Sequence, residues 1–173
     1  QKDVRECVLH TLPLRFGVVT DIAPDVRLTL HNAGHILGSA MVHLHVGEGL
    51  HNIVYTGDYK FSRTMLLEGA TTEFPRVETV ITESTYGGPD DVMPSRMEAE
   101  ERLAAIVNET LERKGKVLIP VPAVGRAQEI MLILDGYMRR GVMKEAPVFI
   151  EGMISEATAI HTAYPEYLGR DVR

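Results

Sequence analysis

The sequence predicts an α/β fold made of two parts, a β-rich first half and a second half in which helices alternate with strands. Before Tyr86, apolar and polar residues alternate at short range, which is typical of strands. After Tyr86, apolar residues recur at helical spacing. The loop from Gly87 to Asp91 separates the two patterns, so we expect one segment over residues 1–86 and a second over 87–173.

Strands are expected at several places in the first half. Residues 26–31 and 41–46 alternate apolar with polar side chains, which is the period-two pattern of a strand with one buried face. The glycine-containing turn at 47–49 leads into a third strand at 53–55, so consecutive strands should pair in antiparallel fashion. A further strand is expected over 79–82.

In the second half, a helix is expected to begin after Ser95. Glu98 follows in the position that completes a capping box, in which the two residues satisfy free amides at a helix start. The remaining elements are expected as strands over 117–119 and 148–150, a helix over 126–140, and a helix capped by Ser155 that ends at Tyr164 before Pro165. Such alternation predicts a parallel sheet covered by helices.

The composition is that of an ordinary globular protein, with 45% hydrophobic and 24% charged residues. The formal net charge is -6, and no block of Lys or Arg is present, which counts against a nucleic-acid partner. Carboxylates that bind divalent metals lower this formal charge without repelling a phosphate substrate. The objection is therefore weak for a metalloenzyme.

The apolar runs are too short to cross a bilayer and no leader peptide pattern is present, so we expect a cytoplasmic protein without membrane contact. The single cysteine, Cys7, rules out an internal disulfide and a cysteine-rich zinc knuckle. Because Cys7 stands among Val4, Val8 and Leu9, we expect a small buried side chain rather than a catalytic thiol.

Two loops that follow strands carry the strongest signal for a site. His35 lies in the first loop, within 31–39, and Asp58 lies in the second, within Thr56-Gly57-Asp58-Tyr59. Imidazole and carboxylate groups are suitable zinc ligands, and the neighbouring glycines allow turns tight enough to direct both side chains to one point. Taken alone, each dipeptide is also typical of an ordinary turn, with a surface histidine or a common Gly-Asp bend.

The order of the two loops resembles a known family. G-H-x-x-G-S followed downstream by T-G-D resembles the third and fourth metal-binding motifs of the metallo-β-lactamase superfamily. The resemblance implies that His35 binds one Zn2+ ion and that Asp58 bridges a pair of them. In nucleases of this superfamily the metal pair holds a hydroxide directed at a phosphodiester phosphorus and neutralises charge on the phosphate oxygens.

Residues 82–87 read T-E-S-T-Y-G and resemble the first signature of the β-CASP subgroup of that superfamily. The resemblance places Glu83 at the acidic position, where a carboxylate orients a histidine that protonates the leaving 3′-oxygen. We therefore take Asp58 and Glu83 as the candidate catalytic residues. Without the neighbouring motifs, Glu83 would be read as a strand-end residue that caps a nearby backbone or pairs with a base.

Two later segments narrow the resemblance. Residues 117–129 resemble the β-CASP passage from strand to helix, and residues 151–168 are similar to archaeal relatives of the nuclease subunit of the cleavage and polyadenylation specificity factor. Arg126 and Gln128 open a helix whose amides favour anions, so the functional interpretation of both is a contact with phosphate or the RNA backbone. The alternative for both is a structural salt bridge or cap, and His161 is expected to be packed.

Other histidines do not fit the motifs. His43 and His45 have the spacing of the superfamily's H-x-H-x-D-H motif, but neither the Asp nor the last His follows, and the motif belongs further upstream. Neither His10 nor His51 has a sequence neighbour that would make it a ligand. We exclude all four as metal ligands.

The resemblance runs along nearly the whole chain and implies an RNA phosphodiester hydrolase. The implied enzyme is an endonuclease, with 5′-to-3′ exonuclease activity also open, acting in RNA 3′-end processing or transcription termination. Implied partners are RNA and KH-type RNA-binding domains in the same parent chain, and a homodimer is compatible with the resemblance. Because the other histidine motifs of the family are absent, we expect the chain to be part of a larger protein and inactive by itself.

Two other functions remain open. A non-catalytic β-CASP scaffold subunit would bind RNA or a protein partner through the same fold, and fold alone does not exclude it. A small-molecule hydrolase of the lactamase fold, such as a thioesterase, would lack the β-CASP segment. The retained His35, Asp58 and Glu83 argue against the scaffold, and everything after Tyr86 argues against the thioesterase.

Overall fold

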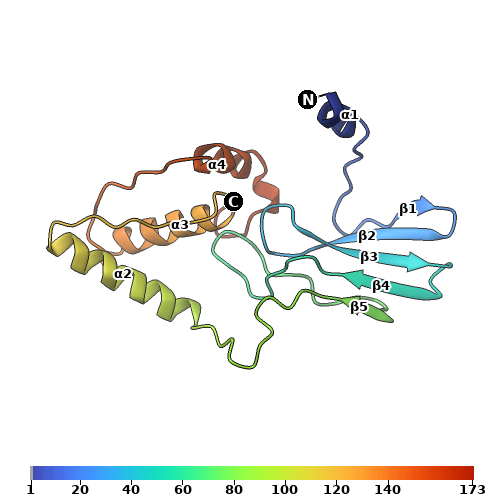
Figure 1. Ribbon diagram of the computed structural model, residues 1–173, viewed down its shortest axis with the longest axis horizontal. Helices are drawn as coiled ribbons and strands as arrows, with labels where there is room; N and C mark the ends of the chain where they lie inside the picture. The colour runs from blue at the N-terminus through green and yellow to red at the C-terminus, as the bar shows by residue number, and fades with distance from the viewer. Residues whose placement is uncertain (1) are drawn as a thin grey trace.

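The computed structural model describes residues 2–173, and these form a five-stranded sheet followed by helices (Figure 1). In chain order the elements are α1 (Lys2–Leu9), β1 (Thr20–Ala23), β2 (Val26–Asn32), β3 (Ala40–Val46), β4 (His51–Tyr55), β5 (Thr79–Ile81), α2 (Arg96–Glu112), α3 (Arg126–Arg139), α4 (Ile154–Ala163) and the short helix η1 (Pro165–Tyr167). The sheet lies on one side of the molecule, and α2, α3 and α4 lie on the other. The predicted α/β class is confirmed.

The sheet follows the chain order β1-β2-β3-β4-β5. Neighbouring strands from β1 to β4 are antiparallel, whereas β5 runs parallel to β4, with Val80 beside Val54. The strands predicted over 26–31, 41–46, 53–55 and 79–82 are thus confirmed in place, and the antiparallel pairing holds for the first three. β1 was not predicted, because its four residues are too short for an alternation to stand out.

The more deeply buried face of the sheet carries polar side chains. Thr29, His43 and Asn52 are 5%, 0% and 2% exposed, and the strand register places His43 opposite Thr29 on one side and Val54 on the other. The His43 side chain contacts the backbone carbonyl of Arg76, so the segment between β4 and β5 covers this face. The opposite face carries half-buried aliphatic side chains: Leu28, Leu30, Val42, Leu44 and Ile53.

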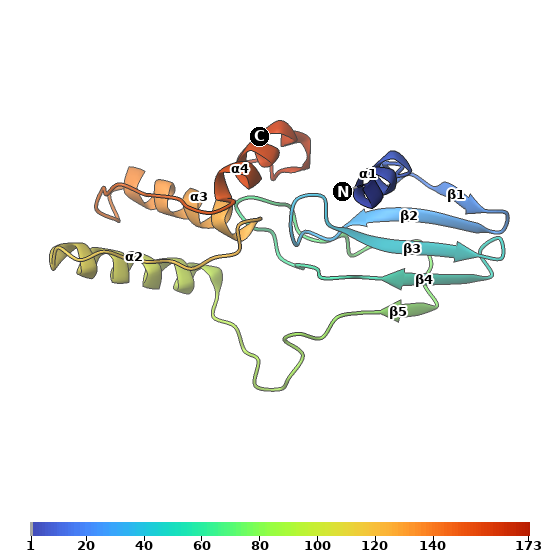
Figure 2. The same ribbon diagram turned by 45° about the horizontal axis from the view of Figure 1, so that its top comes forward.

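The helices pack through a core of their own. α2 begins at the predicted capping box, since the Glu98 amide donates to Ser95 Oγ at 3.2 Å and the Ser95 amide donates to Glu98 Oε2 at 2.8 Å. α2 and α3 lie side by side in both views (Figure 2). The buried residues between them and the following loop are Ala104, Val107, Ile133, Leu134, Tyr137 and Met143.

The strands predicted over 117–119 and 148–150 are wrong. Within residues 2–173 every strand belongs to the first-half sheet, and neither segment forms a ladder. Leu118 is 92% exposed and Phe149 is 90% exposed. An apolar run becomes a strand only where another strand supplies hydrogen-bond partners, and the described chain supplies none to these two segments. The predicted parallel sheet of the second half is therefore not formed by these residues.

Two smaller expectations, the cap at Ser155 and the burial of Cys7, are also wrong. Ser155 does not cap α4, because the helix begins at Ile154 with Met153 at the N-cap position and no side-chain cap. α1 was not predicted, and none of its residues is buried. Cys7 is exposed rather than buried, because α1 stands away from α2 and α3 and no other part of residues 2–173 buries it (Figure 1). In the described chain, no helix is both long enough and apolar enough to span a membrane.

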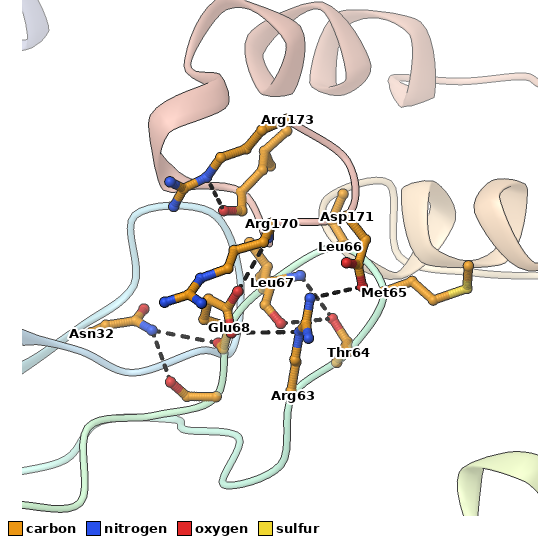
Figure 3. Close-up of polar contacts among 12 residues, drawn as sticks. Asn32, Arg63, Thr64, Met65, Leu66, Leu67, Glu68, Arg170, Asp171 and Arg173 are labelled. Carbon is orange, nitrogen blue, oxygen red and sulfur yellow. Dashed lines mark hydrogen bonds and ion pairs between the residues drawn. The ribbon is translucent and has the colours of Figure 1, made fainter.

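The first-half segment 60–70 joins the two parts of the molecule. The side-chain oxygens of Glu129 on α3 accept from the amides of Met65 at 2.9 Å and Leu66 at 2.8 Å. Arg63 of this segment also forms an ion pair of 2.7 Å with Asp171, which lies near the C-terminus (Figure 3). The predicted division into 1–86 and 87–173 remains a prediction, and these contacts show that the two stretches are packed together.

Candidate metal centre

The predicted site residues lie on loops that leave the same edge of the sheet. β2, β4 and β5 run in one direction, since β3 is antiparallel to both β2 and β4 and β5 is parallel to β4. Their arrowheads point toward the helical part of the molecule (Figure 2). His35 follows β2, Asp58 follows β4 and Glu83 follows β5. The fold therefore brings together three side chains that are far apart in the sequence.

His35 and Asp58 face each other. His35 Nε2 lies 3.7 Å from Asp58 Oδ2, and the two side chains are 41% and 71% exposed. Ser39 holds the histidine loop, because its hydroxyl accepts from the amides of His35 at 3.1 Å and Ile36 at 3.2 Å. The pair is thus an open, solvent-facing nitrogen and oxygen donor set on a loop with a defined shape.

The loop that carries His35 requires glycine at position 34. Its φ is +66°, and a Cβ atom there would stand 2.8 Å from both Ala70 N and Glu68 O and 2.9 Å from Lys60 O. The same loop is tied to the segment after Asp58, since the Lys60 amide donates to Ala33 O at 2.9 Å. The loops that carry His35 and Asp58 are therefore packed backbone against backbone.

Glu83 lies beside these two loops. Its Oε2 accepts from the Thr85 amide at 3.0 Å. Hydrogen bonds from Thr85 hold the pKa of the Glu83 carboxyl below its usual range, and the Tyr59 backbone and the charge of His35 act in the same direction. Glu83 is accordingly a carboxylate at neutral pH, next to the residue that follows Asp58.

A hollow of about 460 Å³ opens next to Glu83. We call it the aromatic hollow, and its lining residues are Tyr59, Lys60, Phe61, Ser62, Glu83, Ser84, Tyr86 and Gly87. A larger hollow of about 560 Å³ lies at the turn between β1 and β2, where Asp21 and Arg27 line it, and none of the predicted site residues reaches it.

The start of α3 lies against the histidine loop. Gly125 has φ +78°, and a Cβ atom there would stand 3.1 Å from Ile36 Cγ2. Arg126 is exposed at this helix start. Gln128, in contrast, is 4% exposed and its side chain caps the helix, accepting from the Gly125 amide at 2.7 Å and donating to Ala123 O at 3.0 Å. The structural alternative is thus correct for Gln128, and Arg126 alone remains a candidate for substrate binding.

Within residues 2–173, no three His, Cys, Asp or Glu side chains converge on one point that could hold a metal ion. His35 and Asp58 would therefore supply only part of a metal site. The excluded histidines are engaged elsewhere: His10 Nδ1 contacts Glu6 O at 2.7 Å, and His51 Nε2 contacts Thr79 Oγ1 at 3.0 Å. His161 is 3% exposed, as expected for a packed side chain.

Sequence reasoning missed a cluster of histidines under the sheet. The His43 ring lies 5.5 Å from that of His31 and 4.1 Å from that of His45, centroid to centroid. Burial first, and then the charge of His45, lowers the pKa of His31 and of His43. From sequence, the period-two alternation already places His43 and His45 on one face of β3. The pairing of β2 with β3 places His31 on the same face of the sheet.

No family model matches the chain. A protein named transcription termination factor FttA from Methanothermobacter thermautotrophicus is 62% identical over 99% of this chain. FttA of Lokiarchaeum is 60% identical over the whole chain, and FttA of Methanocaldococcus jannaschii is 60% identical over 99% of it. The chain is similar to part of FttA. Each match covers 27% of the FttA protein, so the chain spans about a quarter of the length of these relatives.

The relationship to FttA confirms part of the expectation from sequence. The expected archaeal relatives with a role in transcription termination are found. Their name mentions neither RNA hydrolysis nor zinc, and it says nothing of partner domains.

Proposed function

We propose that the natural protein containing this chain is a zinc-dependent ribonuclease that acts in transcription termination. The observation that carries the proposal is the position of His35, Asp58 and Glu83 on loops at one edge of the sheet, with His35 Nε2 and Asp58 Oδ2 separated by 3.7 Å. The relatives named transcription termination factors support the biological setting.

His35 and Asp58 fit part of a zinc site. They offer an imidazole nitrogen and a carboxylate oxygen, which are ordinary zinc ligands, and both side chains are open to solvent. Two ligands are fewer than zinc requires, so the remaining ligands would come from outside the described residues. When bound, a zinc pair supplies an activated water and neutralises charge on a phosphate.

The chain's own residues have distinct parts in this proposal. Glu83, held as a carboxylate by Thr85, would orient a proton-donating histidine from another part of the protein. Arg126 would bind an RNA phosphate, because it is exposed at the start of α3 and that start lies against the loop of His35. Single-stranded RNA is the proposed substrate, and KH-type domains and a second copy are the proposed partners of the whole protein.

The test is RNA cleavage by the natural protein with Asp58→Ala or His35→Ala. Both variants should lose zinc and reduce cleavage to background, because each removes a metal ligand. Asp3→Ala and His10→Ala are matched controls on or beside the exposed α1, and they should leave zinc content and cleavage unchanged. Undiminished cleavage by Asp58→Ala would refute the proposed role of Asp58.

A scaffold function is the second candidate, and it requires no metal ligand beyond His35 and Asp58, the pair that residues 2–173 bring together. A scaffold protein would bind RNA or a protein partner without cleaving RNA. In the same assay, wild-type protein with zinc added would bind RNA and leave it intact. Cleavage that depends on Asp58 separates the nuclease from the scaffold.

A further inference from the structure

The aromatic hollow contains large rings that are left open to water. Phe61 is 73% exposed and Tyr86 is 67% exposed, and both line the hollow together with Tyr59. Single exposed apolar residues are common on protein surfaces. Two exposed rings at one concavity are a different case, since a concave site lined by rings and a few polar groups is the usual form of a ligand site. Tyr59 also lines the hollow, but it packs against the buried cluster of Ala33, Met41 and Ala70.

The hollow is next to the proposed reaction centre. Tyr59 follows Asp58 directly in the chain, and Glu83 is itself one of the lining residues. The Tyr59 backbone is also near enough to the Glu83 carboxyl to influence it. A group bound in the hollow would therefore lie beside His35 and Asp58.

The lining chemistry indicates the kind of ligand. Besides the rings, it contains the cation Lys60 and the hydroxyl side chains Ser62 and Ser84. No Leu, Ile, Val or Met is among the described lining residues, so an aliphatic peptide side chain finds no matching surface. A nucleobase offers a flat face for the rings, hydrogen-bonding edges for the hydroxyls and a phosphate for the lysine.

We propose that the aromatic hollow binds one unstacked base of single-stranded RNA beside the phosphate to be cleaved. Phe61 and Tyr86 would supply the stacking surfaces, and Lys60 would contact the adjoining phosphate. This inference rests on the proposed ribonuclease function and adds to it the conformation in which RNA is held. It predicts that single strands bind and that base-paired RNA does not enter the hollow.

The test is binding of a fluorescein-labelled single-stranded RNA to the natural protein in EDTA, which prevents cleavage. Phe61→Ala and Tyr86→Ala should each raise the Kd about five- to tenfold, near the lower end for loss of one base-stacking ring. The matched variants Phe61→Tyr and Tyr86→Phe keep a ring and should bind like wild type. Because both positions are exposed, the alanine variants should fold normally, and circular dichroism verifies this. Equal Kd values for wild type and both alanine variants would overturn the inference.

A second arm uses RNA with one abasic nucleotide moved along the strand. At one position of the abasic nucleotide, wild-type protein should bind the RNA more weakly than it binds intact RNA. The factor should equal the one by which the alanine substitutions weaken binding of intact RNA. The alanine variants should bind this abasic RNA no more weakly than they bind intact RNA. An equal loss of affinity at every position of the abasic nucleotide would mean that the rings do not bind a single base, and it would contradict the proposal. If Phe61→Ala binds RNA normally and Asp58→Ala does not cleave it, the ribonuclease proposal holds and the proposal for the hollow is wrong. If Phe61→Ala binds RNA weakly and Asp58→Ala still cleaves it, the hollow binds a base and the proposed role of Asp58 is wrong.

Discussion

The Glu129 side chain accepts a hydrogen bond of 2.8 Å from the backbone amide of Leu66. Glu129 lies on α3 and Leu66 lies in the segment that follows Asp58, so this bond joins the helical part to the loops of the candidate site. Its second side-chain oxygen accepts from the Met65 amide at 2.9 Å. Glu129 is 7% exposed, and both amides would lose their partner if the side chain were removed.

Glu129→Ala should therefore lower the free energy of unfolding by about 2–4 kcal/mol, because buried amides without partners are costly. Hydrogen exchange measured by mass spectrometry should show faster exchange in peptides that cover residues 64–67. Glu101→Ala, at an exposed position of α2, is the matched control and should change neither measurement. Unchanged exchange at 64–67 in Glu129→Ala would show that the two bonds do not hold the segment.

Gly34→Ala should disturb the site far more than Gly38→Ala. Both glycines have positive φ, +66° and +77°, so each alanine carries about 1 kcal/mol or more of backbone strain. Only at Gly34 would the new Cβ atom meet backbone atoms, and at Gly38 it would meet nothing within 4 Å. We expect Gly34→Ala to cost about 2 kcal/mol more than Gly38→Ala. Urea denaturation measures the difference, and equal midpoints would contradict it.

The histidine cluster should make the protein less stable in mild acid. The pKa values of His31 and His43 in the fold lie below the ordinary value of 6.5, so the unfolded chain binds protons first as the pH falls. Their contribution is fully present above pH 6.5 and is lost as the pH falls from there through the folded pKa values. His45, Arg76 and Glu78 are the other charged or titratable groups at the cluster.

This prediction is tested by urea midpoints between about pH 7 and pH 5. His31→Phe keeps an aromatic ring next to Phe74 and removes one titrating group, so the fall in midpoint should become smaller. His10→Ala changes an exposed histidine and should leave the pH dependence as in wild type. The Glu78 carboxyl does not confuse the comparison, because hydrogen bonds from Asn52 lower its pKa to about 2 and its titration lies below this range. A fall of the same size in His31→Phe would exclude His31 as a cause.

The sequence predicted those features that depend on local patterns. Alternation placed β2 and β3, and the capping box of Ser95 and Glu98 marked the start of α2. Both signals arise within a few residues, where backbone geometry and side-chain spacing decide the outcome. The pairing of His35 with Asp58 also came from sequence, through motif order, and the parallel direction of β2 and β4 is the physical reason that the two meet.

The features that sequence could not predict depend on what covers a surface. Alternation does not say which face of a strand is covered, and here the face with His43 is the more buried one. Residues 117–119 have the composition of a strand but form none, because no neighbouring strand pairs with them in residues 2–173. From sequence, Gln128 was open to a phosphate contact or a structural cap, and its hydrogen bonds with Ala123 and Gly125 decide for the cap.

The close approach of Gly125 to Ile36 gives the molecule a mechanical property. Together with the bond between Glu129 and Leu66, it attaches α3 to the loops at two separate points. One attachment would act as a pivot, whereas two prevent rotation between the parts. A force applied to α3 would then be transmitted directly to the loop of His35, so the position of the helix and the geometry of that loop are linked.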